Sequence, residues 1–400
     1  MLMKMNRAEE YSKDGYKQSP LGLIPDDWEV KRLGEVCTHF KSGITITSKK
    51  IQEKGQYAVY GGNGFRGYTD MYTHDGEYIL IGRQGALCGN ICFVTGRNYV
   101  SEHAIAVQTS QDIIWLKYKL IFWDLNRFSE SSAQPGLSVE KLIRFQLSIP
   151  PLAEQRKIAE VLSTWDKAIE LQTAIIDKLT LRKKGLMQQL LTGKKRLKGF
   201  SEPWKTIRMR DVFVRVNDKN DGKEYVPMTI SAKVGLISQN QKFDRVVAGN
   251  SLGNYTLLKK GDFAYNKGNS NLFEMGCIYQ LKQEYAVVPF VYICFRNGNV
   301  IRACDDFYQQ FFLDHGLDRQ LKKIITSGAR GDGLLNVDSK DFFGLFIPYP
   351  SYEEQQVIAE NLRLSDIQIE KEKQKLAALK QQKKGLMQQL LTGKKRIKTK

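Results

Sequence analysis

Apolar residues recur at a helical spacing in two long segments of the chain. From Ile158, alternating steps of four and three residues reach ten positions ending at Leu190, and eight of the ten are apolar. The same steps from Ile358 to Leu390 meet seven apolar residues among ten. This spacing is the heptad seam of a coiled coil, and the other faces are too polar for an ordinary core helix. The residues predicted to pair the helices are Ile158, Leu162, Trp165, Ile169, Leu186, Leu190, Ile358, Leu362, Ile369, Leu386 and Leu390.

The two helical segments are near copies of one another. The string "KKGLMQQLLTGKKR" occurs at 183–196 and again at 383–396. Upstream, "IPPLAEQRKIAEVL" starts at 149 and "IPYPSYEEQQVIAENL" starts at 347, so prolines precede both helices. Gly193 and Gly393 stand where a C-terminal stop belongs, each followed by basic residues that suit the negative end of the helix dipole. We expect two helices of about 40 residues, each roughly 60 Å long.

Each seam contains one lysine at the same place, Lys183 and Lys383. A lysine in a seam needs an acidic partner. Two sources remain open: the opposite helix of an antiparallel pair, crossing near its end, or an acid on another protein.

The stretches outside the helices begin and end alike. "IPDDWEVKRLGEV" at 24–36 resembles "SEPWKTIRMRDVF" at 201–213, and both stretches finish with a turn, a short helix and a strand. Their interiors differ and read as short strands, among them the apolar run "AVVPFVYICF" at 286–295, interpreted as one buried strand. We predict an α+β protein: two mixed α/β domains separated by two long helices that form an antiparallel coiled coil, with pseudo-twofold symmetry. The predicted boundaries are 1–150, 151–196 for the central helix, 197–350, and 351–400 for the distal helix.

Charge adds a partner to this picture. The 400 residues include 61 Lys and Arg against 43 Asp and Glu, a net charge of +18. A polyanion such as double-stranded DNA is the expected partner, with an acidic membrane surface as the main competitor. The start of the chain lacks an apolar leader, and no apolar run is long enough to span a membrane. The six cysteines form no metal-binding spacing, which favours reduced thiols and the cytoplasm.

Strings that resemble catalytic motifs fail on context. Gly62, Gly64 and Gly67 match a dinucleotide fingerprint, but the sequence that follows is no helix. "PDDWEVK" at 25–31 resembles a metal-nuclease set, but its elements lie too close together and its repeat partner "SEPWKTIR" lacks the set. An adenine-methylation motif and a nucleophile system are also missing from the sequence. We therefore expect no catalytic residue and no metal site.

Binding chemistry remains. Arginine, lysine, asparagine and glutamine on exposed loops match the donors and acceptors of base edges. The first-domain candidates are Lys41, Tyr60, Asn63, Arg66, Arg83, Gln84 and His103. The second-domain candidates are Asn266, Lys267, Asn269, Ser270, Asn271 and Arg330.

With these motifs the chain resembles the specificity subunits of type I restriction–modification systems. The resemblance rests on "IPPLAEQRKIAEVL", "ILIGRQGALCGN" at 79–90, the pattern P-x-x-W-x-x-x-x-L at 25–33 and the repeated "KKGLMQQLLTGKKR". The "GRQG" element has only a loose second copy, "YNKGNSNLFEMG" at 265–276.

The resemblance implies a function and partners. Two target-recognition domains would each read half of a split, asymmetric DNA sequence, and the helices would fix the spacer. Two methyltransferase (modification) subunits and the restriction/translocase subunits would dock on this chain. S-adenosylmethionine, ATP and Mg²⁺ are expected on those partners, with no cofactor in this chain. Two alternatives stay open: a stand-alone DNA methyltransferase or nuclease, and a bivalent DNA-binding scaffold or repressor.

Overall fold

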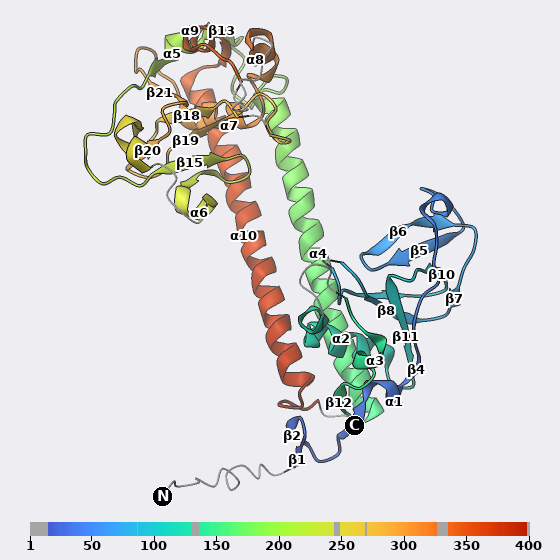
Figure 1. The fold of residues 1–400 in the computed structure, drawn as a ribbon. Coiled ribbons are helices and arrows are strands. Elements are labelled where there is room, and N and C mark those ends of the chain that lie inside the picture. Colours follow the sequence, from blue (N-terminus) through green and yellow to red (C-terminus); the bar gives the residue numbers. More distant parts are fainter. Residues whose placement is uncertain are drawn as a thin grey trace, which may run out of the picture. The chain divides into compact units, whose positions relative to one another are not determined.

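The computed structural model describes residues 15–85, 87–129, 136–243, 249–268, 270–325 and 335–397. Contacts group the chain into two compact units, Met1–Thr173 with Gln374–Lys400 (unit 1) and Ala174–Lys373 (unit 2). Figure 1 shows the two long helices, α4 (Leu152–Leu190) and α10 (Tyr352–Leu390). Each helix contributes one part to each unit. Each unit therefore contains one globular domain, the start of one long helix and the end of the other.

The core of unit 1 is a four-stranded antiparallel sheet in the order β4-β11-β8-β9. Alternation along the strands gives it two apolar faces. Ile79 and Ile105 pack toward α2 and the ends of both long helices, while Leu80 and Ala106 pack in a separate cluster with Val100 of a second sheet. That second sheet has the order β6-β5-β10-β7. The elements named here are β4 (Cys37–Ser42), β5 (Tyr57–Gly61), β6 (Gly64–Thr69), β7 (His74–Asp75), β8 (Tyr78–Gly82), β9 (Ile91–Val94), β10 (Arg97–Val100), β11 (Ala104–Thr109) and α2 (Ile113–Trp123).

Short elements connect this core to the long helices. A hairpin opens the described chain, and the strand after it pairs with the strand that leads into α4. These elements are β1 (Tyr16–Ser19), β2 (Gly22–Pro25), β3 (Glu29–Arg32), α1 (Leu33–Val36), η1 (Ser48–Lys50), η2 (Leu125–Phe128), α3 (Val139–Leu142) and β12 (Gln146–Ile149).

Unit 2 repeats this frame with different contents. Its sheet has the order β14-β21-β18-β19, which matches the unit 1 sheet strand for strand, and a pairing of β13 with β22 leads into α10. In place of the second four-stranded sheet it has two strand pairs, β15-β16 and β17-β20. The elements are β13 (Lys205–Arg208), α5 (Met209–Val212), β14 (Phe213–Arg215), β15 (Met228–Ser231), β16 (Gly235–Ser238), α6 (Gln239–Phe243), η3 (Gly249–Asn254), β17 (Thr256–Lys259), β18 (Phe263–Asn266), β19 (Cys277–Gln280), β20 (Tyr285–Val288), β21 (Ile293–Asn297), α7 (Asp305–Leu313), α8 (Asp318–Ile324), α9 (Ser339–Phe343) and β22 (Phe346–Tyr349).

The prediction of one strand across 286–295 is wrong. β20 ends at Val288 and β21 begins at Ile293, with a turn closed by a hydrogen bond from the N–H of Tyr292 to the carbonyl of Pro289 at 3.1 Å. Proline has no N–H to give to a sheet, so the apolar run breaks there.

Seam residues of the two helices pack together within each unit. In unit 1, Ile158 and Leu162 at the start of α4 share a cluster with Leu390 at the end of α10. In unit 2, Leu190 at the end of α4 shares a cluster with Ile358 and Leu362 at the start of α10. The helices are thus antiparallel in both units. Among the other seam positions, Ile369 is buried, and Trp165, Ile169, Leu186 and Leu386 are half-buried.

Glycine ends both long helices. Gly193 and Gly393 have φ values of +69° and +73°, the left-handed conformation of a C-terminal cap. A Cβ on Gly393 would lie 2.5 Å from the ring of Pro25, and one on Gly193 would lie 3.2 Å from Trp204. The stop positions therefore need glycine for backbone angle and for space.

Within the described part of the chain, no helix is long and apolar enough to cross a membrane.

Candidate nucleic-acid interface

A buried glutamate joins each globular domain to both long helices. In unit 1, Glu154 at the start of α4 accepts a hydrogen bond from the indole N–H of the buried Trp28 at 3.0 Å. The guanidinium of Arg396, beyond the end of α10, donates to both oxygens of the same carboxylate, and also binds Asp27 at 2.7 Å. The carboxylate of Glu154 is buried, but it accepts hydrogen bonds from the charged guanidinium and from the buried indole. These bonds offset the cost of burying its charge. We call this arrangement the joint.

Unit 2 contains a second joint built from the equivalent residues. Trp204 donates to Glu354 at 2.9 Å, and Arg196 binds both oxygens of Glu354 at 2.7 Å. Arg196 and Arg396 are the last residues of the repeated "KKGLMQQLLTGKKR" string. The repeat therefore encodes the helix end that each joint holds.

The glutamine that follows each of these glutamates in the sequence binds the N-cap of a helix in the same domain. The side-chain oxygen of Gln155 accepts from the backbone N–H of Asp112, the N-cap of α2, at 2.9 Å. The oxygen of Gln355 accepts from the N–H of Cys304, the N-cap of α7, at 2.8 Å. This shared contact aligns α2 with α7 residue by residue.

The seam lysines bind acids of the opposite helix, which settles the alternative left open by the sequence. Lys383 of α10 binds Asp166 of α4 in unit 1, and Lys183 of α4 binds Asp366 of α10 at 2.6 Å in unit 2. Asp166 also accepts from the hydroxyl of Tyr118 at 2.6 Å. Burial opposes ionisation of Asp166, but the hydrogen bonds from Lys383 and Tyr118 outweigh it and lower the pKa of this carboxyl.

Three first-domain candidates meet at the end of β8. Arg83 and Gln84 follow this strand directly, and the backbone N–H of Arg83 donates to the carbonyl of His103 at 2.9 Å. The ring N–H of His103 donates to the side-chain oxygen of Gln84 at 2.9 Å. The guanidinium of Arg83 donates to the hydroxyl of Ser42 at 3.0 Å. A cation and an amide are thus held side by side on a fixed turn.

The β5–β6 hairpin carries three further candidates near this turn. Asn63 at its tip and Arg66 on β6 are exposed, and Tyr60 on β5 is half-buried. A Cβ on Gly62 would lie 3.0 Å from the carbonyl of His103 and 3.2 Å from that of Gln84. Because Gly62 has no side chain, the backbone of the hairpin can pack directly against the backbone of the turn after β8.

Lys41 lies apart from this group. It precedes Ser42 on β4, so its side chain leaves the opposite face of the strand from the hydroxyl that binds Arg83. Its charge acts on His39. The pKa of His39 is lowered mainly by burial and, to a smaller extent, by the positive charge of Lys41.

The second-domain candidates begin at the last residue of β18, Asn266. The side-chain oxygen of Asn266 accepts from the N–H of Gly268 at 2.9 Å, and Ser270 exchanges two backbone hydrogen bonds with Phe273 at 3.0 Å. Asn271 is exposed and Lys267 is half-buried. The predicted residues Asn269 and Arg330 lie outside the described residues.

Arg83 and Lys267 occupy equivalent places. Each follows the third strand of its sheet in the matching order, β8 or β18. The carbonyl of Arg83 accepts from the N–H of Leu137 at 2.9 Å, and the carbonyl of Lys267 accepts from the N–H of Leu335 at 2.9 Å. The loose second copy of the "GRQG" element is therefore its structural counterpart.

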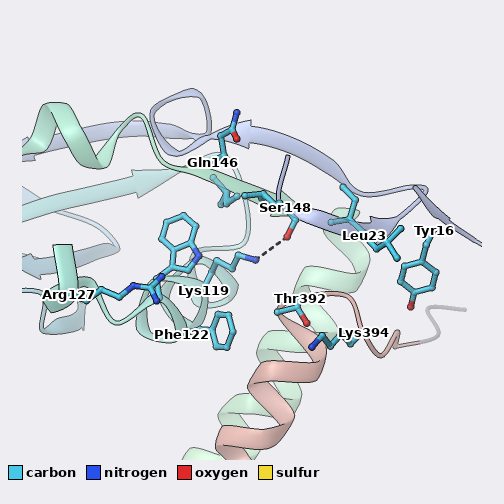
Figure 2. A pocket seen from close by; sticks show the side chains of 13 residues that line it. Tyr16, Leu23, Lys119, Phe122, Arg127, Gln146, Ser148, Thr392 and Lys394 are labelled. Atoms are coloured by element: carbon cyan, nitrogen blue, oxygen red, sulfur yellow. Dashed lines mark hydrogen bonds between the residues drawn. The ribbon is translucent and has the colours of Figure 1, made fainter. Parts of the chain in front are cut away.

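Unit 1 also contains a cavity of about 690 Å³ with a buried lysine (Figure 2). The amine of Lys119 on α2 donates to the hydroxyl of Ser148 at 3.1 Å and to the carbonyl of Leu391 at 2.6 Å. Burial lowers the pKa of Lys119 to about 7. Lys119 and Phe311 each lie seven residues after the N-cap that the joint glutamine holds, so unit 2 has phenylalanine at this position.

The described residues contain no cluster of three or more metal-ligating side chains. Two features recur in both units, a joint and a polar loop beside a sheet. The loop presents a cation and an amide, which are groups that can bind a polyanion.

Comparisons with known proteins identify similar chains. Residues 25–181 match the family model for the type I restriction modification DNA specificity domain. The chain is 40% identical over 168 residues to the type I restriction enzyme EcoprrI specificity subunit of Escherichia coli, a match that spans 41% of that protein. It is 23% identical to the putative type I restriction enzyme MjaX specificity subunit of Methanocaldococcus jannaschii, over 97% of this chain and 98% of that protein.

Solved structures show the same fold. The type I restriction–modification S subunit from M. genitalium matches with a TM-score of 0.58 and 14% identity, over 91% of this chain and 96% of that one. A second solved structure, which concerns complex assembly and conformational transition of the type I R-M system, matches with a TM-score of 0.56 and 14% identity. This match covers 92% of this chain and 99% of that one. The predicted family resemblance and fold class are confirmed.

Proposed function

We propose that this chain, whose residues 25–181 belong to the type I restriction modification DNA specificity domain family, is the subunit that reads the DNA target of such a system. Its two globular domains would each read one half of a bipartite, asymmetric sequence. The unlike interiors of the domains would make the two half-sites different.

The observation that carries this proposal is the pair of equivalent loops. Two sheets of the same strand order each present a cation and an amide at the end of the third strand: Arg83 and Gln84 follow β8, and Lys267 follows Asn266, the last residue of β18. Arginine matches the acceptors of guanine, and glutamine or asparagine matches adenine. Matching frames with different side chains are what two readers of different sequences require.

The net charge of +18 supports a polyanionic partner. Two readers on one chain also bind more tightly than either alone, because the second contact is intramolecular.

We propose further that the covalent chemistry belongs to other subunits. Two methyltransferase subunits and the restriction/translocase subunits would dock on this chain and would carry S-adenosylmethionine, ATP and Mg²⁺. The chain itself would act as a non-catalytic reader.

Methylome sequencing tests the proposal most directly. A strain that expresses this chain together with its methyltransferase subunits is compared with one that expresses the methyltransferase subunits alone. We expect methylated adenines in a two-part motif with a fixed gap only when this chain is present. Methylation without such a motif would overturn the reading function. Methyl transfer or DNA cleavage by the purified chain alone, with methyl donor and Mg²⁺, would favour a stand-alone enzyme.

A further inference from the structure

Two equivalent loops each hold a leucine out in solvent. Leu87, in the loop after β8, is 51% exposed, and Leu272, in the loop after β18, is 49% exposed. Leu87 lies four residues after Arg83, and Leu272 lies five residues after Lys267. The domains share little sequence in this region, so the common feature is an apolar side chain beside the polar reading groups.

Both leucines are placed by a buried anchor. Leu87 is followed by Cys88, which is 1% exposed and whose thiol donates to the carbonyl of Arg83 at 3.2 Å. Leu272 is followed by Phe273, which is 8% exposed and whose N–H donates to the hydroxyl of Ser270 at 3.2 Å.

The backbone of each turn is closed as well. The N–H of Cys88 donates to the carbonyl of Gly85 at 2.9 Å, and the N–H of Asn90 donates to that of Leu87 at 3.0 Å. In the second loop, Ser270 and Phe273 exchange backbone hydrogen bonds at 3.0 Å. The fold therefore holds each leucine in contact with water. Its exposed apolar area contributes no favourable free energy until a partner covers it.

We propose that Leu87 and Leu272 are specificity contacts, each packing against the methyl group of a thymine in its half-site. This inference rests on the proposed function. The thymine methyl is the apolar feature that the major groove presents next to the acceptors and donors of the other bases. A loop with a cation, an amide and a leucine within a few residues has a group for each kind of edge.

The polar neighbours favour a groove contact over insertion between base pairs. A wedge must pass the base edges to separate a step. Here the polar groups of the same short turn have to stop at those edges, and Leu87 is tied to them through Cys88 and Arg83. The leucine therefore stays at the level of the thymine methyl.

Deoxyuridine replacement tests the contact, because uracil lacks only that methyl group. The full chain in complex with its methyltransferase subunits is titrated with duplexes of the methylome-derived target in which each thymine is replaced singly. We expect one position in each half-site to bind about fourfold more weakly with uracil, the worth of one buried methyl group.

The leucine variants complete a double-mutant cycle. Leu87→Ala is expected to abolish the thymine–uracil difference in one half-site only, and Leu272→Ala in the other half-site only. Leu21→Ala is the matched control, since Leu21 is 45% exposed on the β1–β2 turn of unit 1. This control should leave both differences intact, and thermal melting identifies any variant that fails to fold.

The outcomes separate the two proposals. A complex without sequence-selective binding overturns the proposed function. Selective binding with no uracil effect, or with an effect that survives both leucine variants, overturns the leucine contacts alone. Insertion of the leucine between base pairs is tested with 2-aminopurine placed next to the contact position. A rise in its fluorescence on binding that is absent with Leu87→Ala, together with no uracil effect, would show a wedge and would also overturn the methyl contact.

Discussion

Arg83 and Lys267 differ in what they can recognise, although they occupy the same place in their sheets. The arginine presents a planar fork that fits two acceptors of one guanine, whereas the lysine presents a single charged point. The hydroxyl of Ser42 holds the arginine fork at 3.0 Å. The first loop is therefore better suited to read a base, and the arginine is the side chain to remove.

Replacing Arg83 by alanine should relax the sequence preference of one half-site. We expect the discrimination at one base pair to fall by about 1–3 kcal/mol, while the other half-site is read as before. Competition binding with single-base variants of the target measures this. Equal weakening on all sequences would instead identify Arg83 as a phosphate contact. Arg83→Lys is the charge-conserving control.

Lys119 gives a pH-dependent contribution to stability. Burial lowers its pKa to about 7, below the unfolded value of about 10.4. Between these values the unfolded chain binds a proton that the folded chain does not, so this residue makes stability rise with pH. Below pH 7 both states are protonated and the cost of burying the charge is constant.

Lys119→Met should therefore stabilise unit 1 most at pH 6–7, and the advantage should shrink by about 2 kcal/mol by pH 9. Urea unfolding of both proteins at several pH values measures this difference. Lys178→Met, on the exposed face of α4, is the control for the loss of a lysine outside the cavity. A constant difference for Lys119→Met would contradict the assigned pKa.

At the level of elements, each joint clamps one helix end. Glu154→Ala would leave the guanidinium of Arg396 and the buried indole of Trp28 without their common acceptor. Because Arg396 is 35% exposed and keeps Asp27, the cost should be about 1–3 kcal/mol, chiefly from the buried indole left without an acceptor. We expect the end of α10 to exchange its amide hydrogens faster while the end of α4 stays protected. Glu354→Ala should give the mirror result, and loosening of both helix ends by either variant would contradict independent joints.

Among the structural elements, local features were predictable from the sequence, whereas contacts between distant residues were not. The seam, its glycine stops and the repeat were predictable, because helix periodicity and left-handed caps are local properties. The pairing of Trp28 with Glu154 was not, because 126 residues separate them and only the fold brings them together. Leu87 was overlooked since an exposed leucine has no signature in the sequence. The equivalence of Lys267 with Arg83 was not predictable either, because it depends on the strand order of the two sheets.

For the whole molecule, the length of the helices should determine the spacer. Each of the two helices has 39 residues, and one heptad corresponds to about 10 Å. Deleting one heptad from each, at positions paired across the seam, should shorten the accepted spacer by about three base pairs and leave both half-sites unchanged. Methylome sequencing of the variant measures the gap. An unchanged spacer would show that the helices do not set it.

Exchanging the two globular domains tests whether they are the readers. With residues 24–149 and 201–347 interchanged, the halves of the methylated motif should swap order, since each domain keeps its own loop. Methylome sequencing reports the result, with the unexchanged chain as the control. An unaltered motif would place DNA reading on the helices and favour a scaffold or repressor.

The hydrophobic cluster that the first domain shares with the end of α10 has a consequence for synthesis of the protein on the ribosome. Leu33 and Trp115 of the first domain share a buried cluster with Leu390 and Leu391, near the end of the chain. At 5–20 residues per second, the ribosome needs roughly 12–50 s to travel from the close of the first domain to that segment. During this interval the nascent domain must survive with part of its core uncovered. Translation speed and chaperones that shield apolar surface should therefore govern its yield.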